Sequence, residues 1–79
     1  MEQEIEEKLK EIYKNIKIQI NFIEFRKYEI ITRIEYLGTE FESKIIYKLD
    51  TSLTLDTNIS RIVNIIDYKI IIPFYKKGV

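Results

Sequence analysis

The sequence contains neither cysteine nor histidine. Without cysteine the chain has no disulfide, no thiolate nucleophile and no cysteine-based structural zinc site. Without histidine it lacks the commonest metal ligand and the one side chain that ordinarily titrates near neutral pH. These two absences exclude most familiar arrangements for acid–base, nucleophilic and metal catalysis. We therefore expect a protein that is not an enzyme and that uses no metal or other cofactor.

Glycine and proline are scarce, with two and one residues respectively, and alanine is absent. Gly38 and Gly78 lie far apart, so the sequence has no glycine-rich loop of the kind that cradles phosphate groups. Isoleucine, lysine, glutamate, tyrosine and asparagine are abundant instead, which is typical of proteins encoded by AT-rich DNA. This bias describes the genome rather than an activity.

Uninterrupted hydrophobic runs are also missing. The most apolar stretch, residues 59–74, is broken by Arg61, Asp67 and Lys69. A membrane-spanning helix needs about 18 or more consecutive apolar residues. The glutamate-rich start of the chain is unlike a secretory signal peptide. We therefore expect no membrane association and a cytoplasmic location.

What the chain does have is the balance of a small folded protein, with 46% hydrophobic and 33% charged residues among 79. We expect one domain spanning residues 1–79. A chain of this size buries only about 60–65% of the surface that its unfolded form exposes, so its own core provides little stability. Association with a partner or with a second copy would therefore matter to it. The net charge of zero disfavours strong non-specific binding of nucleic acid.

The hydrophobic pattern predicts an α+β fold in the order α-β-β-β-α, with a further strand at the end as an option. Apolar residues at helical spacing begin the chain, at Ile5, Leu9, Ile12, Tyr13 and Ile16. Alternating patterns then predict strands over residues 16–22, 28–37 and 41–49. A second helix is indicated by Ile59, Ile62, Val63 and Ile66, capped by Asp56, Thr57 or Asn58. Residues 68–75 are rich in β-branched and aromatic side chains, and with Pro73 they fit an edge strand. The strands should form a small antiparallel meander of three or four strands, with the helices on one face.

The turn between the second and third strands can be tested against the charges. A two-residue loop of Gly38 and Thr39 would set Glu35 opposite Glu42. A four-residue loop ending at Phe41 sets Glu35 opposite Lys44 instead, so we favour the longer loop. The two registers differ by an even number of residues, and the assignment of side chains to faces is the same in both.

The two faces of the predicted sheet differ in an unexpected way. One face is apolar enough to pack against helices, with Ile18, Ile20, Phe22, Ile30, Ile34, Ile45 and Tyr47. The opposite face also carries Ile23, Phe25, Ile31, Leu37 and Ile46, and the charged residues Lys17, Glu29, Arg33, Lys44 and Lys48 surround the row of Ile23, Ile31 and Ile46. An apolar centre with a charged rim is typical of a protein–protein contact. The alternative is that residues 70–72 or a helix folds across this face and covers it.

This pattern predicts a non-enzymatic protein-binding module that acts by covering a surface of another protein or of a second copy of itself. A small viral or mobile-element regulator or inhibitor of a host protein, working in the host cytoplasm, would fit the size and composition. The predicted contact residues are Ile23, Phe25, Ile31, Arg33, Lys44 and Ile46.

A second hypothesis is nucleic-acid binding. Basic and aromatic residues alternate in residues 25–28 and 74–77, a pattern that can stack on bases and neutralise phosphates. The residues concerned are Arg26, Lys27, Lys69, Lys76 and Lys77. The order of elements resembles that of double-stranded-RNA-binding domains. Those domains carry a Lys-Lys-x-x-Lys run at the start of their second helix, where residues 58–61 of this chain have only Arg61.

Overall fold

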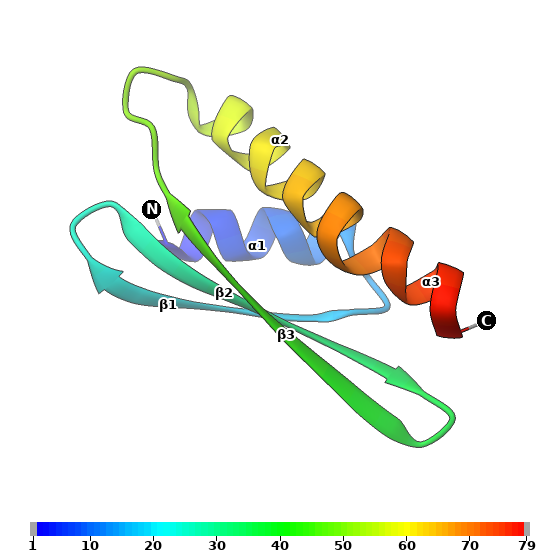
Figure 1. Cartoon of the computed structure of the whole chain (residues 1–79). Coiled ribbons are helices and arrows are strands. Elements are labelled where there is room, and N and C mark those ends of the chain that lie inside the picture. Colours follow the sequence, from blue (N-terminus) through cyan, green and yellow to red (C-terminus); the bar gives the residue numbers. More distant parts are fainter. Residues whose placement is uncertain (1, 79) are drawn as a thin grey trace.

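The computed structural model describes the backbone from Glu2 to Gly78 and the side chains as far as Lys76. The elements follow the predicted α-β-β-β-α order (Figure 1). They are α1 (Glu2–Ile12), β1 (Lys17–Glu24), β2 (Lys27–Tyr36), β3 (Thr39–Lys48) and α2 (Leu55–Ile66), which continues through the π-helical turn η1 (Asp67–Ile71) into α3 (Ile72–Gly78). None of the described helices is long and apolar enough to cross a lipid bilayer.

The three strands form one antiparallel sheet in the order β1-β2-β3. Figure 1 shows all the helices on one side of this sheet. The first helix, α1, contacts β1 and α2, so it flanks the β1 side of the sheet. Consequently β3 lies at the other edge, and β2 is the only one of the described strands to which it is paired.

The core lies between the sheet and the helices, where the alternating pattern placed it. Its buried side chains are Ile5 and Leu9 of α1, Ile18, Ile20, Ile30 and Tyr47 of the strands, Leu49, and Ile59, Ile62 and Ile66 of α2. Burying an isoleucine side chain of this kind contributes roughly 1.5–3 kcal/mol. Phe22 is an exception among the residues expected on this face, because it is 60% exposed where β1 approaches its turn.

A buried asparagine connects the end of β3 to the start of α2. The side-chain oxygen of Asn58 accepts hydrogen bonds from the Tyr47 hydroxyl (2.7 Å) and the Asp50 N–H (3.0 Å). Its amide nitrogen donates to the carbonyl oxygens of Asp50 and Thr54, both at 2.9 Å. Both oxygen lone pairs and both N–H groups of this side chain are therefore occupied, so its burial leaves no polar group without a partner.

The predicted caps of the second helix were wrong. The N-cap is Thr54, whose side chain accepts a hydrogen bond from the Thr57 N–H (3.1 Å). Asp56, Thr57 and Asn58 instead lie inside the first turns of α2. Leu55 lies four residues before Ile59 and packs against the core, so the apolar stripe of α2 begins one turn earlier than the sequence reading placed it.

The loop between β2 and β3 was also predicted wrongly. It is a two-residue turn of Leu37 and Gly38, both with positive φ (51° and 78°), as in a type I′ hairpin. This turn sets Arg33 opposite Glu42, and like charges meet only near the two ends of the hairpin, at Glu35 with Glu40 and at Lys27 with Lys48. The observed register differs from the expected one by an even shift, so the faces are as predicted.

The predicted fourth strand does not form, because residues 68–75 continue the second helix. Proline inside an α-helix clashes with the carbonyl group four residues earlier, which for Pro73 belongs to Lys69. Here the helix widens into η1 immediately before the proline, and the Ile72 N–H bonds to the Asp67 carbonyl five residues back. A π-helical turn of this kind accommodates the proline within a continuous helix.

Candidate functional site

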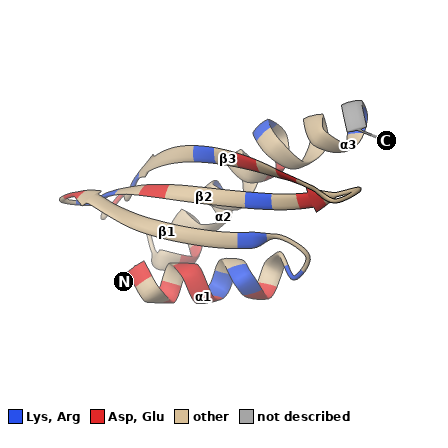
Figure 2. Ribbon diagram, turned by 90° about the horizontal axis from the view of Figure 1, so that it is seen from below, with Lys and Arg blue, Asp and Glu red and all other residues tan. Residues whose placement is uncertain are grey.

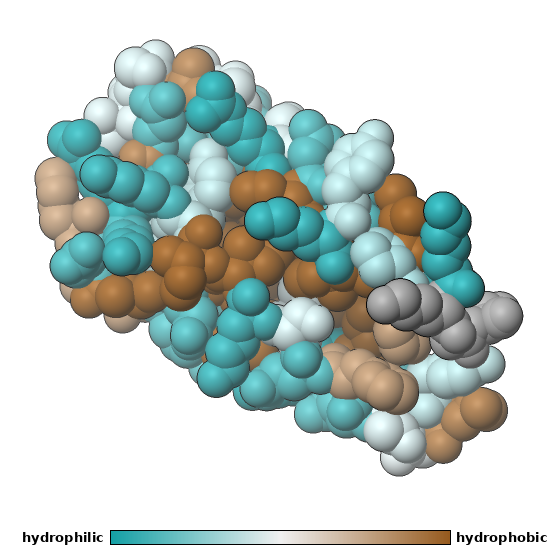
Figure 3. Space-filling model, viewed as in Figure 1, coloured by the Kyte–Doolittle hydropathy of each residue, from teal (hydrophilic) through white to brown (hydrophobic). Residues whose placement is uncertain are grey.

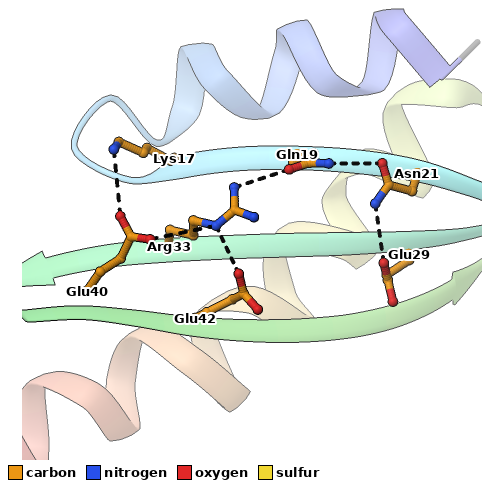
Figure 4. A network of polar contacts seen from close by, with 7 residues as sticks. All are labelled: Lys17, Gln19, Asn21, Glu29, Arg33, Glu40 and Glu42. Atoms are coloured by element: carbon orange, nitrogen blue, oxygen red, sulfur yellow. Dashed lines mark hydrogen bonds and ion pairs between the residues drawn. The ribbon is translucent and has the colours of Figure 1, made fainter.

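The sheet face that points away from the helices is held by a network of polar side chains centred on Arg33 (Figure 4). The Arg33 Nε donates to Glu42 Oε1 at 3.0 Å, and its Nη1 donates to Gln19 Oε1 at 3.1 Å. Glu40 lies 3.7 Å from Lys17 and 3.8 Å from Arg33, which relieves the repulsion between these two directly opposed cations. Each strand therefore contributes charge to the same network.

This network changes the position of the predicted apolar centre. Ile31 was expected to be exposed on this face, but only 6% of its surface is accessible. Its cross-strand neighbours are Gln19 and Lys44, and its neighbours along β2 on the same face are Glu29 and Arg33. The long stems of such side chains cover apolar surface while their polar ends stay in water. Ile31 is thus sealed beneath the protein's own side chains and cannot serve as a contact.

The remaining predicted contact residues form two separate groups. Ile46 (52% exposed) and Lys44 lie on β3, and Ile46 pairs with Glu29 rather than with Ile31, so the expected row of three isoleucines is wrong. Ile23 lies at the bulge before the β1–β2 turn. The adjoining turn residue, Phe25, is 76% exposed, with the Arg26 guanidinium 4.5 Å from the centre of its ring.

No described helix covers this face of the sheet, as Figure 2 shows. The alternative that residues 70–72 fold across it was therefore wrong. These residues lie on the opposite side, where Ile70 is buried and the adjoining Phe74 packs edge-on against Tyr36 (5.9 Å) and Phe41 (5.4 Å between ring centres). The C-terminal helices thus cover the inner face of the β2–β3 hairpin.

The most distinctive feature for binding is the free edge of β3, which extends over ten residues. The Leu49 N–H, just after β3, donates to the Arg26 carbonyl at 2.6 Å. Because hydrogen-bonded residues alternate along an antiparallel strand, the odd-numbered residues of β3 also face β2. The even-numbered residues Glu40, Glu42, Lys44 and Ile46 therefore direct their backbone N–H and C=O groups outward.

A groove of about 510 Å³ adjoins this edge, between the β2–β3 hairpin and the C-terminal helices. Four consecutive β3 residues, 40–43, contribute to its wall, so residues from both faces of the strand border the groove. Its apolar side includes Ile34, Phe41, Ile70 and Phe74, while Glu40, Glu42 and Lys69 supply charge. Hydrophobic side chains run as a band between the helices and the sheet on the side that presents β3 (Figure 3). The groove can therefore accept apolar side chains from a chain that pairs with β3.

The basic residues of the second hypothesis do not form one surface. Arg26 and Lys27 lie at the β1–β2 turn, and Lys69 and Lys76 lie at the opposite end of the molecule (Figure 1). The Lys77 side chain lies outside the described residues. Lys27 forms an ion pair with Glu24 (3.7 Å). Arg26 does line a shallow hollow with Lys48 and Arg61, but Asp50, 3.7 Å from Arg61, supplies an opposing charge there.

The perturbed titratable groups lie in structural contacts rather than in the groove. Burial, with the Asp67 carboxylate as hydrogen-bond partner, raises the pKa of the Tyr13 hydroxyl. Burial also raises the pKa of Tyr47, and the nearby Arg61 charge opposes this effect. Two hydrogen bonds from Ser52 lower the pKa of Asp50. Within residues 2–78 no group of three or more acidic side chains is placed to hold a metal ion.

The fold and this edge define a small α+β domain in which the outer edge of β3 is free among the described strands and lies beside an apolar groove. Comparison of the chain with protein-family models, with curated proteins and with solved structures found no match.

Sequence reasoning missed the groove residues Phe41 and Phe74 as partners. It also did not predict the free outer edge of β3, because residues 68–75 were expected to add a strand. The helical spacing of Ile66, Ile70 and Phe74 was the available signal that the helix continues over the end of the hairpin.

Proposed function

We propose that this protein is a non-enzymatic protein-binding module that accepts an extended chain segment along the edge of β3. The observation that carries the proposal is a ten-residue strand whose outer edge pairs with no other described strand and is bordered by an apolar groove. Strand addition of this type obtains affinity from backbone hydrogen bonds and specificity from pockets for alternate side chains. The bound segment belongs to another protein or to a second copy of this chain.

The way that β3 is built supports this proposal. Natural proteins block exposed strand edges with proline, bulges, very short strands, a covering element or charged side chains. β3 has no proline, and its pairing with β2 runs without a bulge over its whole length. Its outward-facing residues include both acids and bases, at Glu40, Glu42 and Lys44. Charges of both signs select a partner with the complementary pattern and do not repel every strand.

The groove and the charges describe the segment that would fit. It is an extended strand whose side chains alternate, with apolar residues entering the groove beside Phe41 and Phe74. Its other face carries charges opposite in sign to those of β3. Such a protein acts by occupying the partner's strand. We propose this occlusion as the activity of a small regulator or inhibitor of a host protein, encoded by a virus or mobile element.

The proposal can be tested with a change to one backbone group. In Lys44→Pro an outward N–H is removed, which an edge strand tolerates because that group faces solvent. The matched control, Lys44→Ala, removes the same side chain but keeps the N–H. Proteins recovered from lysates of the producing cell on the tagged wild-type chain should also be recovered on Lys44→Ala and lost on Lys44→Pro. Equal recovery on the proline variant would contradict strand addition, provided that circular dichroism shows both variants folded.

A further inference from the structure

We infer that the segment bound along β3 is β3 of a second copy, paired antiparallel about a two-fold axis at Ser43. This inference rests on the proposed function, because it names the partner for the same edge. The pairing would join two three-stranded sheets into one six-stranded sheet. The outer edges of that sheet are the two β1 strands, each flanked by its own α1.

The faces of the strand restrict the registers that a symmetric pair can use. Two identical antiparallel strands are related by an axis perpendicular to the sheet, so the helix-covered faces of both sheets lie on the same side. The axis must then pass between two copies of one residue. An axis at Ser43 pairs Thr39 with the partner's Tyr47 and keeps almost all of β3 in contact.

The charges favour this axis over its neighbours. With Ser43 on the axis, Glu42 lies opposite the partner's Lys44, and by symmetry Lys44 lies opposite the partner's Glu42. An axis at Glu42 would place two carboxylates directly opposite each other, and an axis at Lys44 would do the same with two ammonium groups. Like charges at such positions are destabilising, and opposite charges are stabilising.

Contacts within the single chain leave Glu42 and Lys44 in positions that suit this pairing. Glu42 is held at 3.0 Å by Arg33 on its inner side, and the partner's Lys44 would approach it from the open side. Among the described residues Lys44 forms no ion pair of its own. The dimer therefore gives this lysine a carboxylate and continues the row that runs from Lys17 through Arg33 to Glu42.

The groove side of the strand is complementary as well. In the same register Phe41 lies opposite the partner's Ile45. Phe41 is 45% exposed, and Ile45 is only partly buried. The partner's Ile45 would enter the groove beside Phe41 and Phe74, and its counterpart would enter the partner's groove. Each copy thus supplies both an apolar side chain and the groove that receives one.

A cysteine at the axis tests the register. Ser43 directs its backbone groups to β2, so the two copies of Ser43 form a non-hydrogen-bonded pair with Cα atoms about 4.5 Å apart. That separation permits a disulfide, and the chain has no other cysteine. Under mild oxidation Ser43→Cys should become a covalent dimer almost completely, whereas Ser60→Cys, exposed on α2, should stay monomeric. Equal cross-linking of the two variants would overturn the register.

A charge exchange provides an independent test. Lys44→Glu would set Glu42 opposite a glutamate twice in each dimer, and Glu42→Lys would set Lys44 opposite a lysine twice. By analytical ultracentrifugation we expect each variant alone to dimerise at least tenfold more weakly than wild type. A mixture of the two variants restores both opposite-charge pairs and should form a heterodimer. Unchanged dimerisation of the single variants, or no association in the mixture, would overturn the inference.

The outcome also separates this inference from the proposed function. A wild-type chain that sediments as a monomer at millimolar concentration overturns the dimer. If such a monomer still binds a foreign protein that Lys44→Pro loses, strand addition stands and only its occupant was wrong. If it binds none, the proposed function fails together with the dimer.

Discussion

Thr32 and Asn58 are the two buried polar residues in the part of the chain whose side chains the structure describes, and their hydrogen bonding differs. Asn58 is bonded through both its oxygen and its nitrogen to Tyr47, Asp50 and Thr54. The Thr32 hydroxyl, in contrast, is buried with no hydrogen-bond partner among the described atoms. A buried hydroxyl without a partner costs free energy, because it has lost its bonds to water. Asn58 thus stabilises the junction of β3 and α2, whereas Thr32 weakens the centre of the sheet.

Thr32→Val should therefore stabilise the protein. Valine has nearly the same shape as threonine and removes only the unpaired hydroxyl, so we expect the free energy of unfolding to rise by about 1 kcal/mol. Urea denaturation followed by circular dichroism measures this change. The matched control is Thr39→Val on the exposed end of β3, which should change stability by less than about 0.5 kcal/mol. A loss of stability in Thr32→Val would show that its hydroxyl has a partner in solution.

At the scale of the elements, the Tyr13 side chain joins the end of α1 to the junction of α2 and η1 by hydrogen bonds. The Tyr13 hydroxyl, just after α1, lies 2.6 Å from Asp67 Oδ1 at the start of η1 and 3.2 Å from the Val63 carbonyl. Tyr13 therefore connects α1 to the point where α2 widens into its π-helical turn. This turn in turn sets the direction of α3 and the position of Phe74 over the hairpin.

The raised pKa of Tyr13 predicts a dependence of stability on pH. The folded protein holds the phenol proton more tightly than the unfolded chain, whose tyrosine pKa is about 10. The contribution of Tyr13 is therefore complete below about pH 10 and is lost as the pH rises through the higher folded value. Tyr13→Phe should be about 1 kcal/mol less stable than wild type at pH 7, because the hydrogen bond is lost.

Urea denaturation between about pH 7 and 11 measures the effect. The difference between the two proteins should narrow as the pH passes about 10. Lysines and the other tyrosines are present in both proteins, so their titration largely cancels in the comparison. A constant difference over the whole range would contradict the assigned role of Tyr13.

At the scale of the whole molecule, the shape is elongated, with extents of 40 × 20 × 18 Å. The helices cover one face of a three-stranded sheet, and no other described strand pairs with the outer edge of β3. A chain of 79 residues has a small core and little stability to spare. Pairing at β3 would satisfy an open row of backbone groups and bury Phe41 and Ile45, so folding and association would support each other.

The inferred dimer predicts a melting temperature that depends on protein concentration. For a chain that dimerises only when folded, each tenfold increase in concentration adds about 1.4 kcal/mol per dimer. The melting temperature of wild type should then rise by roughly 3 °C per tenfold increase. Lys44→Glu, which dimerises more weakly, should show a smaller rise over the same range of concentration. A constant value for wild type, measured by differential scanning calorimetry above and below the dissociation constant, would contradict the coupling of folding to dimerisation.

The periodicity of the sequence by itself determined the first helix, the three strands, the second helix and the faces of the sheet. The spacing of Ile5 and Leu9, or of Ile18 and Ile20, depends only on how side chains project from a helix or a strand, which is a local property of the backbone. The assignment of side chains to the two faces of the sheet was correct although the predicted loop was wrong, because both registers have the same parity.

Tertiary structure alone decided the accessibility of the predicted contact and the identity of the free edge. Ile31 has the parity of an exposed residue, yet the stems of four surrounding side chains cover it, and their positions depend on the pairing of three strands. Residues 68–75 have the composition of a strand, yet they form a helix because α2 continues through η1 and packs Phe74 onto Phe41. The local conformational preferences of the residues do not predict these outcomes. Each outcome depends on which surface, distant in the sequence, is available to bury the same apolar side chains.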